Sequence, residues 1–235
     1  MAKRGIAMAS RKRLGASVLS NLCTIGLLGC ISFFGLSPGA WANDDTGTLI
    51  ITLNAPVMDG AVMDQPRAYF IRAQRVDGKE GTQIRYEQSL LVKSPNDFES
   101  SGGDGAVFTK ELSPGDWVVS LFQLERHSAH LRPTKEFAIP FKIQAGRGTY
   151  IGNFQPVAYK TNGGIDGVYF VVTDKSARDV PIARAHTPGL GPVDVSVFDV
   201  DTLQHPLFRS HDGQAAEPGE GQYCVYMNLL GCHQF

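Results

Sequence analysis

Large apolar residues recur at every second position in several short stretches of this chain, and this pattern constrains its fold more than any other feature. The alternation is unbroken from Phe137 to Ile143, and it recurs over residues 48–53 and 193–197. Successive side chains of a β-strand point to opposite faces, so a period of two places one face of each stretch in a core. The pattern therefore predicts β-strands.

Further strand candidates are separated by turn-forming sequences such as Asp77-Gly78 and Pro114-Gly115. These candidates are residues 69–76, 89–93, 117–124, 150–154 and 168–173. No window of a dozen residues has a good helical period, and the nearest candidate, residues 176–184, is interrupted by Pro181. Short strands at regular spacing predict an all-β protein, folded as an antiparallel β-sandwich in a single domain.

The first 42 residues have the pattern of an export signal. A basic start without acidic residues is followed by a mostly apolar stretch from Leu14 to Leu36. Ala40-Trp41-Ala42 then supplies the small residues that a signal peptidase recognises. We therefore expect residues 1–42 to be a signal peptide, residues 43–203 to be the sandwich domain, and residues 204–235 to be a loop-rich tail.

Two alternatives to cleavage after Ala42 remain open. The apolar stretch is long enough for a membrane anchor, although several polar residues dilute it. Leu27-Leu28-Gly29-Cys30 resembles a bacterial lipobox, in which Cys30 would be acylated. The expected location is the periplasm or cell envelope, and the alternative is a lipoprotein anchored through Cys30.

Loss of the signal makes the remaining chain acidic. Five of the 22 basic residues and none of the 23 acidic ones lie in residues 1–42, so the mature charge is 17 minus 23, or −6. Such a charge, without a basic stripe, argues against nucleic acid and anionic lipid as partners. We expect no transmembrane segment in the mature chain.

Two cysteines remain after cleavage, Cys224 and Cys232. In an oxidising compartment this pair predicts a structural disulfide. Seven residues separate the two thiols, which is not the spacing of a thiol oxidoreductase or of a zinc knuckle.

Residues 104–119 (DGAVFTKELSPGDWVV) resemble the signature of transthyretin-like sandwich modules, such as the regulatory-like domains of carboxypeptidases. In those modules a Leu and then Pro-Gly-x-aromatic follow an Asp-Gly turn, and Pro114, Gly115 and Trp117 occupy the later positions. The resemblance implies that Trp117 anchors a strand in the core. Val107 departs from it, because the family has an aromatic residue there and Phe108 comes one place later.

A second stretch, residues 141–152 (FKIQAGRGTYIG), looks like bacterial exported proteins and lipoproteins of unknown function. In these proteins a strand, an Ala-Gly turn and a Tyr-x-Gly strand recur. They share no established activity, so the resemblance implies no catalytic residue.

No group of residues has the spacing of a known catalytic or metal site. His127 and His130 come nearest to a metal pattern, but residues three apart in a strand face opposite ways. Neither G-x-S-x-G nor a Gly-rich phosphate loop is present. We predict no cofactor.

Two clusters of charged residues could still form a site in space. The carboxylates are Asp174, Asp179, Asp194, Asp199 and Asp201, and the basic residues are Arg67, Arg72, Arg75 and Arg85. The acidic set could serve a paired-carboxylate hydrolase, and the basic set could meet a ligand that carries a carboxylate. The plainer interpretation of both sets is turns and solvent-facing strand positions.

Acidic charge, a strand-rich scaffold and the lack of a catalytic motif together predict a non-enzymatic binding or assembly protein of the bacterial envelope. Its partner would be an envelope protein or polymer, and its oligomeric state is open. The alternatives are an envelope-polymer hydrolase that uses carboxylates from distant strands and a periplasmic metal-handling protein.

Overall fold

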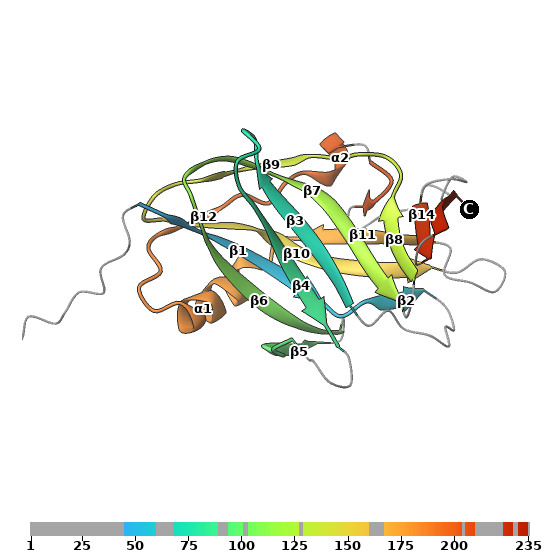
Figure 1. Cartoon of the computed structure of the whole chain (residues 1–235). Helices are drawn as coiled ribbons and strands as arrows, with labels where there is room; N and C mark the ends of the chain where they lie inside the picture. Colours follow the sequence, from blue (N-terminus) through green and yellow to red (C-terminus); the bar gives the residue numbers. More distant parts are fainter. Residues whose placement is uncertain are drawn as a thin grey trace, which may run out of the picture. The chain divides into compact units, whose positions relative to one another are not determined.

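The computed structural model describes residues 45–59, 68–88, 94–100, 103–126, 129–159, 167–203, 205–209, 223–227 and 230–234, the last two by their backbone alone. All of them belong to the larger of two units into which the chain divides, residues 38–235. The proposed signal peptide, its cleavage site and Cys30 lie outside the described residues. The described part is mostly β (Figure 1).

Sheet A has the strand order β13-β11-β10-β1-β6-β5, and β12 and β2 also pair with β10. Its strands are β1 (Gly47–Asn54), β2 (Val57–Asp59), β5 (Phe98–Ser100), β6 (Gly103–Leu112), β10 (Gly148–Tyr159), β11 (Gly167–Thr173), β12 (Val193–Val195) and β13 (Phe208–Arg209).

Sheet B has the order β15-β14-β8-β7-β3-β4, and β9 also pairs with β7. Its strands are β3 (Ala68–Arg75), β4 (Gly81–Glu87), β7 (Gly115–Arg126), β8 (Ala129–Pro133), β9 (Ile139–Ile143), β14 (Tyr223–Met227) and β15 (Leu230–Gln234). Two helices complete the described elements, α1 (Ser176–His186) and α2 (Val200–Leu203).

The two sheets share one hydrophobic core. Leu49, Ile51 and Leu53 of β1 belong to the same buried cluster as residues of β3 and β7. The Phe122 ring of sheet B meets the Phe170 ring of sheet A edge-on, with centroids 4.4 Å apart. The expectation of a mostly β protein with two packed sheets is therefore confirmed.

Sheet A is mixed, whereas the sequence analysis predicts antiparallel strands throughout. β1 pairs antiparallel with β6 but parallel with β10. A parallel pair needs a long connection, and the chain between β1 and β10 passes through sheet B. The strict alternation in β9 is confirmed, because Ile139, Phe141 and Ile143 are buried and the residues between them are exposed.

The Pro114-Gly115 turn carries the chain from sheet A to sheet B. β6 ends at Leu112 and β7 begins at Gly115, whose φ of 143° lies in a region that favours glycine. Trp117 follows two residues later and is fully buried. Its indole N–H donates to the Ser113 carbonyl at 3.0 Å, so the aromatic ring also fixes the corner.

Helix α1 contradicts the expectation that Pro181 interrupts residues 176–184. The helix is continuous from Ser176 to His186 with Pro181 inside it. A proline there removes one helical hydrogen bond and disfavours the helix by its own propensity. Contacts with sheet A must therefore stabilise α1, which lies against β1, β6 and β10.

Part of the region expected to be a loop-rich tail pairs with the sheets. β13 extends sheet A beside β11, while β14 and β15 form an antiparallel pair at the β8 end of sheet B. No helix of the described part is long and apolar enough to cross a membrane.

Candidate functional site

A bulge in β10 prepares a polar site on the face of sheet A that α1 covers. Tyr150 pairs with Ile50 and Asn153 pairs with Thr52, so β10 has one residue more than β1 over this interval. Gly152 lies in the bulge with φ of 125°. The extra residue turns Tyr150 and Asn153, which regular alternation would place on opposite faces, towards the same side of the sheet.

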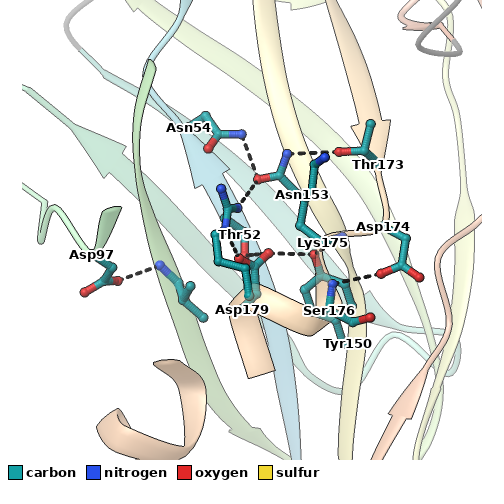
Figure 2. A network of polar contacts seen from close by, with 12 residues as sticks. Thr52, Asn54, Asp97, Tyr150, Asn153, Thr173, Asp174, Lys175, Ser176 and Asp179 are labelled. Atoms are coloured by element: carbon teal, nitrogen blue, oxygen red, sulfur yellow. Dashed lines mark hydrogen bonds and ion pairs between the residues drawn. The ribbon is translucent and has the colours of Figure 1, made fainter. Parts of the chain in front are cut away.

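Asp179 of α1 is the centre of this site and is fully buried. Its Oδ2 accepts hydrogen bonds from the Thr52 hydroxyl and the Tyr150 hydroxyl, both at 2.7 Å. Its Oδ1 accepts from Arg178 Nε at 2.6 Å. Figure 2 shows the Thr52 and Tyr150 side chains reaching the carboxylate from two neighbouring strands. We call these contacts and those of Asn153 the Asp179 network.

Asn153 joins the helix to three strands. Its Oδ1 accepts from Arg178 Nη2 at 3.0 Å and from Asn54 Nδ2 at 2.9 Å. Its Nδ2 donates to Thr173 Oγ1 at 3.2 Å, as Figure 2 shows. The Arg178 guanidinium also lies 3.5 Å from the centroid of the Phe98 ring, so it is held on two sides.

The chemistry of the Asp179 network is that of a clamp. Burial, followed by the hydrogen bond to Asp179, raises the pKa of the Tyr150 hydroxyl well above its ordinary value, so this group stays protonated and donates. No buried side-chain nitrogen or oxygen of the described residues lacks a hydrogen-bond partner. The donors and acceptors are used in holding α1 to sheet A.

The other end of α1 is fixed as well. His186 Nε2 lies 3.1 Å from Asp97 Oδ1, and Asp97 Oδ2 accepts the Val107 backbone N–H at 2.7 Å. Thr187 donates to Thr109 Oγ1 at 2.9 Å. These contacts attach the last turn of the helix to β6 and to the segment before β5.

Three of the five carboxylates considered for a hydrolase each bind a different group. Asp179 belongs to the clamp, Asp174 accepts the Ser176 backbone N–H at 2.8 Å, and Asp194 forms an ion pair with Arg147 at 2.5 Å. Arg147 holds the pKa of the Asp194 carboxyl below its usual value. These three carboxylates are thus already bonded, and none of these contacts joins one to another.

Of the two histidines considered for metal, His127 lies outside the described residues. His130 Nδ1 is 3.2 Å from Gln123 Nε2 on the outer face of sheet B. Within the described ranges, no three His, Cys, Asp or Glu side chains are placed to hold a metal ion.

Two arginines of the predicted basic cluster, Arg75 and Arg85, have carboxylate partners among the described residues. Arg85 binds Glu125 through two nitrogens, at 2.8 and 2.6 Å, and also binds Glu87. Its guanidinium lowers the pKa of the Glu125 carboxyl. Arg75 pairs with Asp77 at 3.4 Å, whereas Arg67 lies outside the described residues.

Strand β4 gives sheet B an open edge. Its Glu87 donates its N–H to Ser94 Oγ at 2.8 Å and accepts the Ser94 N–H at 2.7 Å. In an antiparallel pair each residue directs both backbone groups to one side, and the side alternates along the strand. The N–H and C=O groups of Gln83 and Arg85 therefore point to the same side as those of Glu87, away from β3, where no described strand pairs with them.

The cysteines lie on the neighbouring strands β14 and β15. Cys224 pairs with Gln234 in the backbone register, and Val225 pairs with His233. The side chains of these strands are not among those described, so the disulfide between Cys224 and Cys232 stays a prediction.

Comparison with known proteins gives no family for the chain. No protein-family model matches it, and no curated protein matches it. One solved structure that it resembles is named "Putative cell adhesion protein", from Parabacteroides distasonis, with 11% identity and a TM-score of 0.30. The match covers 54% of this chain and 40% of that one.

Sequence reasoning missed most of the Asp179 network. The sequence pattern presents Asp179 only as one of five carboxylates in turns and solvent-facing strand positions, and it gives no role to Thr52 or Asn153. Tyr150-Ile151-Gly152 was the available signal, because a glycine inside a strand often marks a bulge. The partners themselves come from segments about 100 residues apart, as between Asn54 and Asn153, so no local pattern connects them.

Proposed function

We propose that this protein is an exported, non-enzymatic binding or assembly protein of the bacterial envelope, built on a transthyretin-like sandwich. It acts by adding an extended segment of an envelope partner to the outer edge of β4. Such β-augmentation uses backbone hydrogen bonds for affinity and side-chain contacts for specificity.

The observation that carries this proposal is the length of the open β4 edge. The other ends of the sheets are the short strands β5, β13 and β15, of three, two and five residues, whereas β4 has seven. Proteins commonly protect sheet edges with short strands, so a longer exposed one offers a template for pairing. Ser94 occupies only the Glu87 end and leaves Gln83 and Arg85 available.

The buried residues of β4 also support this proposal, because they fix the position of the edge. Ile84 and Tyr86 of β4 are buried, while Gln83 and Arg85, on either side of Ile84, are exposed. The alternation fixes the register of β4 on β3, because a slip by one residue would expose the buried pair. A partner strand would therefore meet a fixed set of donors and acceptors.

Site-specific cross-linking tests the proposal. A photoreactive amino acid at position 83 of the exported protein should give adducts with an envelope component, while the same group at the exposed Val195 of β12 should not. Arg85→Pro removes an outward N–H and should abolish the adducts. Arg85→Ala, which loses the same side chain but keeps the N–H, should retain them.

Adducts that persist in Arg85→Pro would show that β4 is not the binding edge. Release of envelope-polymer fragments by the purified protein, lost in Asp194→Asn, would instead favour a hydrolase.

A further inference from the structure

Arg72 is an exposed cation beside the open edge, and no carboxylate of the described residues forms an ion pair with it. It lies on β3, where its register partner in β4 is Gln83. Two neighbouring arginines, Arg75 and Arg85, do have carboxylate partners. Arg72 therefore differs from these two arginines, because it has no carboxylate partner within the described part of the chain.

The Arg72 guanidinium reaches the edge because Gly81 leaves space for it. A Cβ placed on Gly81 would lie 3.8 Å from both Arg72 Nε and Nη2. Gly81 is the first residue of β4, and it pairs with Gln74 on the same face as Arg72 and Gln83. If a partner strand paired with the outer edge of β4, its side chain opposite Gly81 would therefore lie close to the Arg72 guanidinium.

We propose that the segment bound at β4 is an extended peptide with an Asp or Glu side chain, and that this carboxylate pairs with Arg72 above Gly81. The inference rests on the proposed function and names the chemistry of the partner. A guanidinium presents parallel N–H donors that match a carboxylate, and such pairs are stronger than neutral hydrogen bonds. The mature charge of −6 does not oppose this, since salt screens charges beyond about 10 Å.

A substitution at Gly81 can place a competing carboxylate of the protein itself beside Arg72. Its φ is not in the left-handed region, and an added Cβ would meet its neighbours at ordinary contact distances of 3.5 Å or more. Gly81→Asp should place a carboxylate of the protein itself on Arg72. Gly81→Asn adds a side chain of the same shape and reach without charge and is the matched control.

Selection from a displayed library of random linear heptapeptides on the purified full exported protein tests the inference. We expect the bound peptides to be enriched in Asp or Glu at one position of an alternating strand pattern. A synthetic peptide from this set should lose about tenfold in affinity when that residue becomes Asn or Gln, and Arg72→Gln should cause a similar loss. Gly81→Asp should weaken binding of the acidic peptide, while Gly81→Asn should not.

The outcomes separate the two proposals. Peptides without acidic enrichment that Gln83→Pro releases and Gln83→Ala retains would overturn the acidic partner and leave the β4 edge in place. Peptides whose binding is insensitive to Gln83→Pro would overturn both. Self-association in sedimentation that Gln83→Pro abolishes would overturn the peptide partner, because the occupant would then be a second copy of the chain.

Discussion

The Asp179 carboxylate is fully buried between α1 and sheet A, where one cation and two hydroxyl groups hold it. A buried charge is tolerated when it is paired and hydrogen-bonded, and removal of one partner leaves the others unsatisfied. At the scale of single residues, this site is where the attachment of α1 is most sensitive to substitution.

Asp179→Asn should therefore destabilise the protein. The substitution keeps the shape but removes the charge that faces Arg178. Because the Arg178 side chain is 33% exposed and can regain water, we expect a loss of about 2–3 kcal/mol, below the range for fully buried pairs. Urea unfolding measures it. Asp174→Asn, on the exposed turn nearby, should cost less than about 0.5 kcal/mol, because an Asn Oδ1 can still accept the Ser176 N–H.

Trp117 tests the packing of the corner between the sheets. Trp117→Ala should cost about 3–5 kcal/mol in denaturant melts, as for large aromatic residues in cores. Trp117→Phe should cost less, because a ring remains beside Phe141, whose centroid is 6.4 Å from that of Trp117. A loss below about 1 kcal/mol for the alanine variant would contradict the structural role of this residue.

At the scale of elements, the segment from α2 to β13 contains a histidine with both ring nitrogens engaged. His205 is buried, with its Nδ1 3.2 Å from the Leu207 N–H and its Nε2 3.2 Å from the Lys135 carbonyl. These contacts assign the neutral tautomer with the proton on Nε2. Burial lowers the pKa of this imidazole below its ordinary value.

Acid should therefore weaken the fold through His205. The unfolded chain takes up its proton near the ordinary pKa of about 6.5, while the folded imidazole resists protonation to lower pH. The stability contributed by neutral His205 is thus complete above this value and is lost as the pH falls below it, until the lowered pKa of the folded state is passed. Unfolding free energies at about pH 7.5 and 5.5 measure the effect.

His205→Gln provides the control, because it cannot titrate. The fall in stability over this pH interval should be smaller in the variant than in the wild type. Equal falls would mean that carboxylates or other histidines account for the whole acid effect.

Some of these elements could be predicted from the local sequence, and others could not. β9 could be predicted because burial of one face of a strand requires an apolar residue at every second position, which the local sequence shows directly. α1 could not, because Pro181 opposes it and the compensating contacts come from β1 and β10, far away in the chain. The bulge at Gly152 likewise needs the pairing of β10 with β1, which no local window contains.

Val107 stands where the family that residues 104–119 resemble has an aromatic residue, and the packing of β6 accounts for this difference. Val107 lies in the small cluster beneath α1, while Phe108 packs against the main core. In this chain Phe108, and not residue 107, is the aromatic residue of β6 that packs against the main core.

At the scale of the whole molecule, the C-terminal strands test the predicted compartment. Cys224 and Cys232 are expected to form a disulfide in the exported protein, which would restrict the unfolded chain by roughly 2.6 kcal/mol on the entropy model. Thiol titration of protein recovered from the envelope, under denaturing and non-reducing conditions, should find no free thiol from this pair. Two free thiols would overturn the disulfide and reopen the redox and metal alternatives.

The open edge of sheet B is the feature on which the proposed function rests, and backbone amide exchange tests it most directly. Two-dimensional NMR of the protein in deuterated water should show an alternating pattern along β4. The Gln83 and Arg85 amides should exchange quickly, while those of Ile84 and Tyr86, which face β3, should be protected. Equal protection of all four amides would show that the edge is already covered and would contradict the account.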